Sequence, residues 1–148
     1  MLIATLIELF ERDLKRLETE IQTYRDESLL WQTGGDIRNS PGNLVLHLVG
    51  NLNHYIGGTL GHTGYVRNRD REFTDINIPR PVLLEKIRQT ATVIRNTLSR
   101  LQAEDLESAY PLAVLGKKEM TTMFFLIHLT THLNYHLGQI NYHRRLTG

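Results

Sequence analysis

A chain of 148 residues, 41% of them hydrophobic and 22% charged, has the size and balance of one globular domain over residues 1–148. Its formal net charge of +1 gives no field that would attract nucleic acid or an anionic membrane, so neither is expected as a partner. The chain has no Cys, which excludes disulfides, Cys-rich zinc sites and a cysteine nucleophile. Any thiol in its chemistry must come from a small molecule.

No stretch approaches the roughly 20 apolar residues of a membrane span. The N-terminal segment has no basic region and soon reaches Glu8, Glu11 and Asp13, unlike a secretory signal. The sequence therefore predicts a cytoplasmic location.

The first predicted helix covers residues 2–24. Its apolar positions recur at steps of three and four, and they are Leu6, Phe10, Leu14, Leu17, Ile21 and Tyr24. Residues 25–39 break this pattern, with a turn at Gly34 and Gly35. The apolar residues 29–31 of this stretch are expected to cover one end of the core.

The second predicted helix covers residues 41–60, because Ser40 and Pro41 form a helix start signal. Several glycines after residue 56 are expected to end it. A long connection follows over residues 63–80, with a charged run at 67–72. Connections of this length inside a compact domain are uncommon and are often functional.

A third helix is predicted over residues 81–101, and residues 102–119 are expected to be irregular, with a short extended piece at 112–115. The last helix is predicted to begin near Thr121 or Thr122 and to end near Arg144. Four long helices in one domain predict an all-α protein, an antiparallel or mixed four-helix bundle.

The seven histidines gather on two of these helices. Those of the second helix and its exit are His47, His54 and His62, and those of the last helix are His128, His132, His136 and His143. At about 100° per residue, the last four fall within a sector of about 80°, and His47 lies within about 20° of His54.

Imidazoles that face one another in a core lose their protons, and their nitrogens then need partners. A divalent metal resolves both problems, because neutral imidazole is its ligand. His132 and His136, four residues apart, can bind one ion together. A third His from a facing helix would complete the three-ligand site typical of catalytic zinc. Taken singly, histidines such as His54, His62, His128 and His143 are more often hydrogen-bonded core residues than ligands.

Residues 131–140, THLNYHLGQI, resemble the fourth-helix signature H-x-x-x-H-x-G-Q of the DinB/YfiT superfamily. Residues 40–48, SPGNLVLHL, resemble its second-helix signature, and residues 47–51 with 67–73 resemble an uncharacterised branch. The resemblance covers nearly the whole chain. It implies a DinB-like four-helix bundle with long connections.

The resemblance further implies a metal-binding histidine triad of His47, His132 and His136. Members of the superfamily are often dimers and bind zinc, nickel or a similar ion, so zinc or nickel is expected here first. Several members are thiol-dependent transferases or isomerases that use bacillithiol, mycothiol or glutathione, and many have no known activity.

Other residues near these motifs have two interpretations each. Gln139 shares the histidine stripe and could orient a ligand imidazole, or it could be a buried amide. Gly138, inside a helix, suggests close helix approach or room beside the metal, or tight packing alone.

The charged run carries Arg67, Arg69 and Arg71. Guanidinium groups bind carboxylates, so these arginines could hold a low-molecular-weight thiol in the site. The alternative is a solvated loop tied by Asp70 and Glu72.

Three functions remain open, and no residue is assigned as catalytic. The first is a thiol-dependent S-transferase acting on small electrophiles through the three-His site. The second is a non-catalytic, metal-stabilised dimeric protein for binding or stress response. The third is a metal-dependent hydrolase, which is weakened because residues 132–136 lack the Glu of H-E-x-x-H. A homodimer is expected from the resemblance, from the apolar residues 29–31 and from the long connection.

Overall fold

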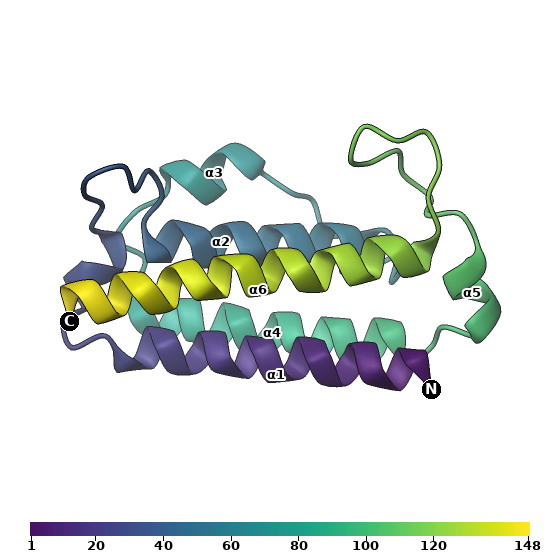
Figure 1. The fold of residues 1–148 in the computed structure, drawn as a ribbon, viewed down its shortest axis with the longest axis horizontal. Coiled ribbons are helices and arrows are strands. Elements are labelled where there is room, and N and C mark those ends of the chain that lie inside the picture. Colours follow the sequence, from purple (N-terminus) through teal and green to yellow (C-terminus); the bar gives the residue numbers. More distant parts are fainter.

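The computed structural model describes all residues 1–148 and shows four long helices in one bundle (Figure 1). These helices are α1 (Leu2–Thr23), α2 (Pro41–Leu52), α4 (Arg80–Leu98) and α6 (Thr122–Thr147). Helix α1 packs on α4 and α6, and α2 packs on the same two helices. Helices α1 and α6 run in one direction and α2 and α4 in the other, so the bundle is mixed (Figure 1). The predicted all-α bundle is confirmed.

Helix α1 has the predicted amphipathic pattern, and its periodic apolar residues are buried. A short 3-10 helix, η1 (Glu27–Trp31), follows, and the Asp26 side chain accepts a hydrogen bond from the Ser28 amide at 2.8 Å. Leu30 is fully buried, and the Trp31 ring lies against the backbone of Gly42, where a Cβ would collide with it. Leu29 and Trp31 are partly buried and pack against the core, so residues 29–31 cover the core of the monomer, as expected.

Helix α2 begins as predicted, with the Ser40 hydroxyl accepting a hydrogen bond from the Asn43 amide. The predicted single helix to residue 60 is wrong in detail. The α-helix ends at Leu52 and continues as a π-helical segment, η2 (Asn53–Gly58). Such segments insert an extra residue into the helix and are frequent at functional positions.

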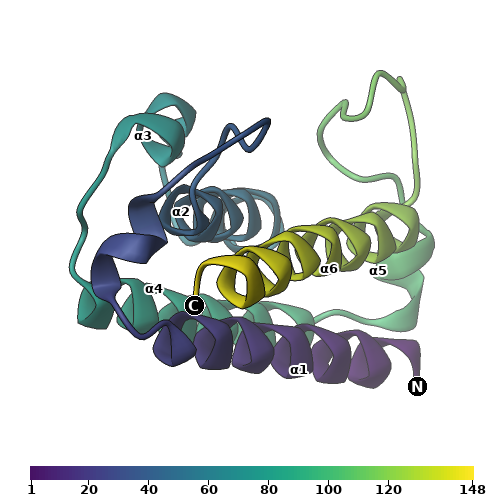
Figure 2. The same ribbon diagram turned by 60° about the vertical axis from the view of Figure 1, so that its left-hand side comes forward.

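The connection predicted as a loop contains helix α3 (Arg69–Thr74). The Asn68 side chain caps it by accepting a hydrogen bond from the Arg71 amide at 3.3 Å. Helix α3 packs on α2, where the Asn43 side-chain amide donates to the backbone carbonyls of Glu72 and Asp75. In both ribbon views, α3 lies over the outer side of α2 (Figures 1 and 2).

The segment between α4 and α6 also contains a short helix, α5 (Ala103–Glu107), closed by a capping box of Gln102 and Asp105. The expected extended piece at residues 112–115 is absent, and the backbone pairing nearby is one bridge between Ala109 and Thr121. No helix of the structure combines the length and the apolar character that crossing a membrane requires.

Candidate metal centre

Three imidazoles meet in the groove between α2 and α6. His47 comes from α2, and His132 and His136 come from successive turns of α6. One ring nitrogen from each lies within 4.8 Å of the others. The Nε2 atoms of His47 and His132 are 3.2 Å apart. The structure therefore brings together the three histidines that the sequence predicted as ligands.

A buried carboxylate orients His47. Glu72 of α3 is 6% exposed, and its Oε1 lies 3.0 Å from His47 Nδ1. Arg67 donates two hydrogen bonds to the same carboxylate, at 2.8 and 2.9 Å. Burial alone would raise the pKa of Glu72, but the hydrogen bonds from His47 and Arg67 outweigh it and hold the pKa below its ordinary value. The carboxylate accepts a hydrogen bond from the Nδ1–H group, which leaves the Nε2 lone pair of His47 free at the centre.

Room for this carboxylate comes from Gly50. A Cβ at this position of α2 would overlap the Glu72 carboxylate. The helix that carries His47 therefore lacks a side chain where the acid from α3 must approach.

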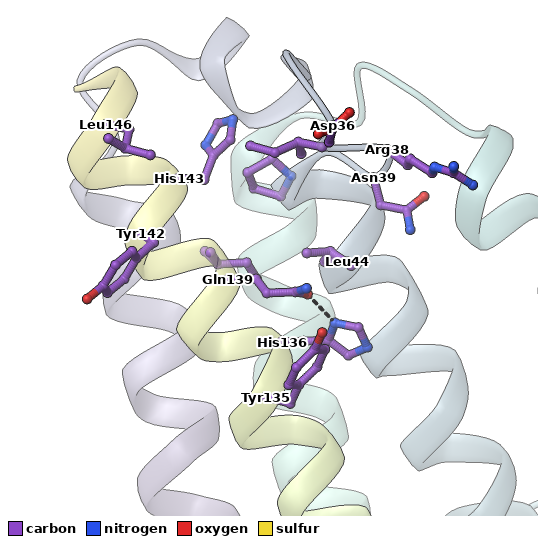
Figure 3. A pocket seen from close by; sticks show the side chains of 13 residues that line it. Asp36, Arg38, Asn39, Leu44, Tyr135, His136, Gln139, Tyr142, His143 and Leu146 are labelled. Carbon is purple, nitrogen blue, oxygen red and sulfur yellow. Dashed lines mark hydrogen bonds between the residues drawn. The ribbon is translucent and has the colours of Figure 1, made fainter.

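His136 is oriented by its own helix. Its Nδ1 lies 2.7 Å from Gln139 Oε1, one turn further along α6 (Figure 3). Burial lowers the pKa of His136, the hydrogen bond to Gln139 raises it, and the neighbouring His47 lowers it, with a net decrease. Gln139 thus holds a neutral imidazole with its Nε2 free, as the sequence suggested it could.

His132 has no such partner. Burial, followed by the nearby His136 and His47, lowers its pKa to about 4, so the ring is neutral at pH 7. Its Nδ1 atom is buried and makes no hydrogen bond. A buried polar atom without a partner is costly, and His132 is the one ring of the three that no protein side chain orients through Nδ1.

The cluster fits a divalent ion. Two nitrogens 3.2 Å apart can each lie about 2.0–2.1 Å from one ion, the usual zinc–imidazole distance. Three neutral imidazoles also suit nickel, copper or iron. His47, His132 and His136 would hold the ion, with Glu72 and Gln139 orienting two of the rings.

The remaining histidines stand apart from the three. His143 is buried, with Nδ1 2.8 Å from the Tyr24 hydroxyl and Nε2 3.0 Å from the Gln32 carbonyl oxygen, so it is a structural residue. His128 lies beside the cluster, with its ring centre 6.4 Å from that of His132. His54 packs against Tyr55, and His62 is exposed at the exit of the helix.

The three arginines differ in their surroundings. Arg67 is paired with Glu72, and the exposed Arg71 is paired with Asp75 at 3.1 Å. Arg69 lies over the Phe73 ring and forms no ion pair. Arg67 and Arg69 line a cavity of about 540 Å³ together with His47 and His132, whereas Arg71 does not.

The surroundings of Gly138 differ from those expected from the sequence. No atom lies within 4 Å of the position that a Cβ would occupy, so neither close helix approach nor tight packing explains this glycine. It lines a shallow hollow beside Arg16 and Glu20 rather than the histidine cluster.

Sequence reasoning missed the part played by Glu72 and assigned this acid only to a solvated loop. A signal was present, because Asn68 is a good helix cap and Phe73 supplies an apolar position one turn later. A short helix there would have turned Glu72 toward α2.

Comparison with known proteins identifies the family. The family described as the DinB superfamily matches residues 9–140. A DinB-like protein from Bacillus cereus ATCC 10987 has a similar structure, with a TM-score of 0.74 and 18% sequence identity over 97% of this chain and 91% of that one. At this identity the likeness concerns the fold alone. No curated protein matches the chain. The extent of the family match, on a helical bundle that gathers the three histidines, shows that the chain belongs to the DinB superfamily.

Proposed function

We propose that this protein is a metal-dependent S-transferase that joins a low-molecular-weight thiol to a small electrophile. His47, His132 and His136 hold one divalent ion, with zinc or nickel as the first candidates. The observation that carries the proposal is the cluster of three imidazoles whose ring nitrogens meet within 4.8 Å beside a cavity.

An ion held by three neutral imidazoles keeps its full +2 charge and supplies stabilisation for an anionic ligand such as a thiolate. The protein has no Cys, so the sulfur nucleophile has to come from solution. Glu72 and Gln139 fix the orientation of His47 and His136 before the thiol arrives. Glu72, the carboxylate that contacts the cluster, is bound by both His47 and Arg67 and is therefore not free to act as the base of a hydrolase.

The cavity that His47 and His132 line is here called the cationic cavity. Its polar lining includes Asn51, Tyr55, Arg67, Arg69 and His128, and it contains no acidic residue. Glu72 already neutralises Arg67, so Arg69 is the guanidinium available for a carboxylate of the thiol. The cationic cavity therefore favours an anionic thiol.

The transfer is a substitution. The thiol releases its proton to solvent, and a sulfur lone pair forms a carbon–sulfur bond with the electrophile. The bond from that carbon to its leaving group breaks, and the leaving group departs with the electron pair.

The test is a panel of anionic and neutral thiols with a chromogenic electrophile, using the metal-loaded protein and His136→Ala. We expect metal-dependent turnover with anionic thiols, loss of turnover in His136→Ala, and an increase of about tenfold in the KM for the thiol in Arg69→Ala. Arg71→Ala is the matched control, because this arginine lies outside the cationic cavity. If no thiol reacts or binds at millimolar concentration, the transferase proposal fails.

A second candidate is a metal-stabilised, non-catalytic dimer, favoured by an exposed apolar face on α6. The exposed residues of this face are Phe124, Ile127, Tyr135, Tyr142 and Leu146. Apolar helix faces of this extent often mark protein–protein contacts. We expect a light-scattering mass of twice the monomer and a monomer in Phe124→Glu plus Ile127→Glu. A wild-type monomer at high micromolar concentration would exclude the dimer.

A further inference from the structure

The histidine cluster divides the groove between α2 and α6 into two cavities of about 540 Å³ each. The cationic cavity extends toward Tyr55, near the end of α2, and His128, near the start of α6. The other cavity extends toward the start of α2 and the end of α6, and His136 lies at its edge. Because α2 and α6 are antiparallel (Figure 1), the residues that line the two cavities lie on opposite sides of the three histidines along the groove.

The second cavity has apolar walls, and we call it the apolar cavity. The apolar residues that line it are Ile37, Pro41, Leu44, Ile140 and Leu146. Its two formal charges, Asp36 and Arg38, have opposite signs and lie on the exposed loop before α2. Arg38 extends away from His136 at the rim (Figure 3). A cavity of this volume and composition suits a small uncharged apolar molecule.

We propose that the apolar cavity binds the second substrate of the proposed transfer, an uncharged electrophile with an alkyl or aryl body. This inference rests on the proposed function. The thiol occupies the cationic cavity, the electrophile occupies the apolar cavity, and the two reacting atoms meet at the histidine cluster.

The polar end of the apolar cavity determines how the electrophile is oriented. Gln139 Oε1 accepts the hydrogen bond from His136, while the amide nitrogen of the same side chain has no protein partner. This amide lies between the apolar walls and His136 (Figure 3). It can donate to an oxygen next to the electrophilic carbon, such as a carbonyl oxygen, and so turn that carbon toward the histidines.

Separate cavities imply that the two substrates bind together rather than in competition. Burying a carboxylate against apolar walls is costly, so the apolar cavity rejects an anion. The cationic cavity is lined by two arginines and therefore favours an anion. The apolar cavity therefore determines specificity for the electrophile and the cationic cavity for the thiol.

The experiment measures binding without turnover. Acetophenone serves as an unreactive uncharged probe and S-methylglutathione as an unreactive anionic one, each titrated into the zinc-loaded protein and followed by NMR of the backbone amides. We expect acetophenone to shift the amides of Ile37, Leu44 and Ile140. The Kd of acetophenone in the presence of saturating S-methylglutathione should stay within about twofold of its value without it.

Two variants make the test specific. Ile37→Glu places a carboxylate in the wall and should weaken acetophenone binding about tenfold or more. Ile76→Glu is the matched control, because Ile76 is also an exposed isoleucine, on the connection after α3 and outside the apolar cavity. The Kd of acetophenone for Ile76→Glu should equal that for the wild type.

The inference is overturned if acetophenone shifts residues of the cationic cavity, if S-methylglutathione displaces it, or if Ile37→Glu binds it as the wild type does. The outcome is separate from that of the proposed function. Acetophenone bound in the apolar cavity of a protein that turns over no thiol would contradict the transferase and leave the cavity assignment standing. Turnover with an unchanged KM for the electrophile in Ile37→Glu would support the transferase and contradict the cavity assignment.

Discussion

Two histidines three turns apart on α6, His132 and His143, are surrounded in opposite ways. Both ring nitrogens of His143 have protein partners, the Tyr24 hydroxyl and the Gln32 carbonyl. His132 has a buried Nδ1 with no partner, and its Nε2 faces another imidazole. The two rings share one side of one helix, yet the protein completes the hydrogen bonding of one and leaves the other incomplete.

The difference shows what separates a structural histidine from a candidate ligand. Helical spacing is common to both residues, and His143 is buried while His132 is half-buried, so neither spacing nor deep burial marks the candidate ligand. A ring whose two nitrogens are satisfied gains nothing from an ion and ties the loop before α2 to α6. His132 keeps an unpaired Nδ1, and its Nε2 lies against His47, so no hydrogen bond to the rest of the protein occupies the nitrogen that could bind an ion.

The comparison is tested most strongly by metal affinity. We expect His132→Ala to weaken zinc binding by about 100-fold or more, because it removes one of three ligands. His143→Ala should bind zinc as the wild type does. Competition with a chromogenic chelator after full reconstitution measures both. Equal affinity in wild type and His132→Ala would refute the assignment of the ligands.

The support from α3 can be tested with one charge change. Glu72→Gln keeps an acceptor for His47 Nδ1 but removes the negative charge, so zinc affinity should fall about 10- to 100-fold. Asp70→Asn is the control, because the Asp70 carboxylate lies on the same short helix and contacts neither His47 nor Arg67. The same chelator competition applies, and a loss of equal size in both variants would assign the effect to the charge of α3 in general.

In the metal-free protein, substitution of His143 should reduce stability more than substitution of His132, the reverse of their effects on zinc affinity. We expect His143→Ala to lower the free energy of unfolding by about 1–3 kcal/mol, because Tyr24 and Gln32 lose a buried partner. His132→Leu should be neutral or stabilising, since it removes an unpaired buried nitrogen. Urea unfolding in the presence of a chelator measures both changes. A larger loss in His132→Leu than in His143→Ala would contradict the comparison.

A smaller effect is expected in the pH dependence of the metal-free protein. Folding lowers the pKa of His132 from 6.5 to about 4, so the unfolded chain binds the proton more tightly. The contribution of this residue to stability is complete above pH 6.5 and is lost as the pH falls toward 4. Solvent reaches part of the ring, so we expect a change on the order of 1–2 kcal/mol.

The measurement is urea unfolding at several pH values between 4 and 7, with a chelator present. In His132→Leu this part of the pH dependence should disappear. A slope identical to that of the wild type would show that another group titrates.

Sequence alone predicted the bundle and the gathering of His47, His132 and His136, because helical periodicity and the family motifs both act over short stretches. It did not predict that Glu72 supports His47, because that contact joins residues 25 positions apart. Helical spacing alone could not separate His143 from His132 and His136, and only the family motif left it out of the triad. The partners of His143 come from α1 and from the segment after η1, and only the folded chain brings them to α6.

The missing side chain at Gly50 has a wider consequence. His47 and Gly50 are three residues apart on one face of α2, and the acid that supports the imidazole arrives over the glycine. Alanine, the residue that helices favour most, would exclude that acid while leaving all three histidines in place. A relative that keeps the three histidines but carries a larger residue at this point is therefore expected to have lost the acidic partner of the first histidine, although a comparison of the histidines alone would count the two proteins as equivalent.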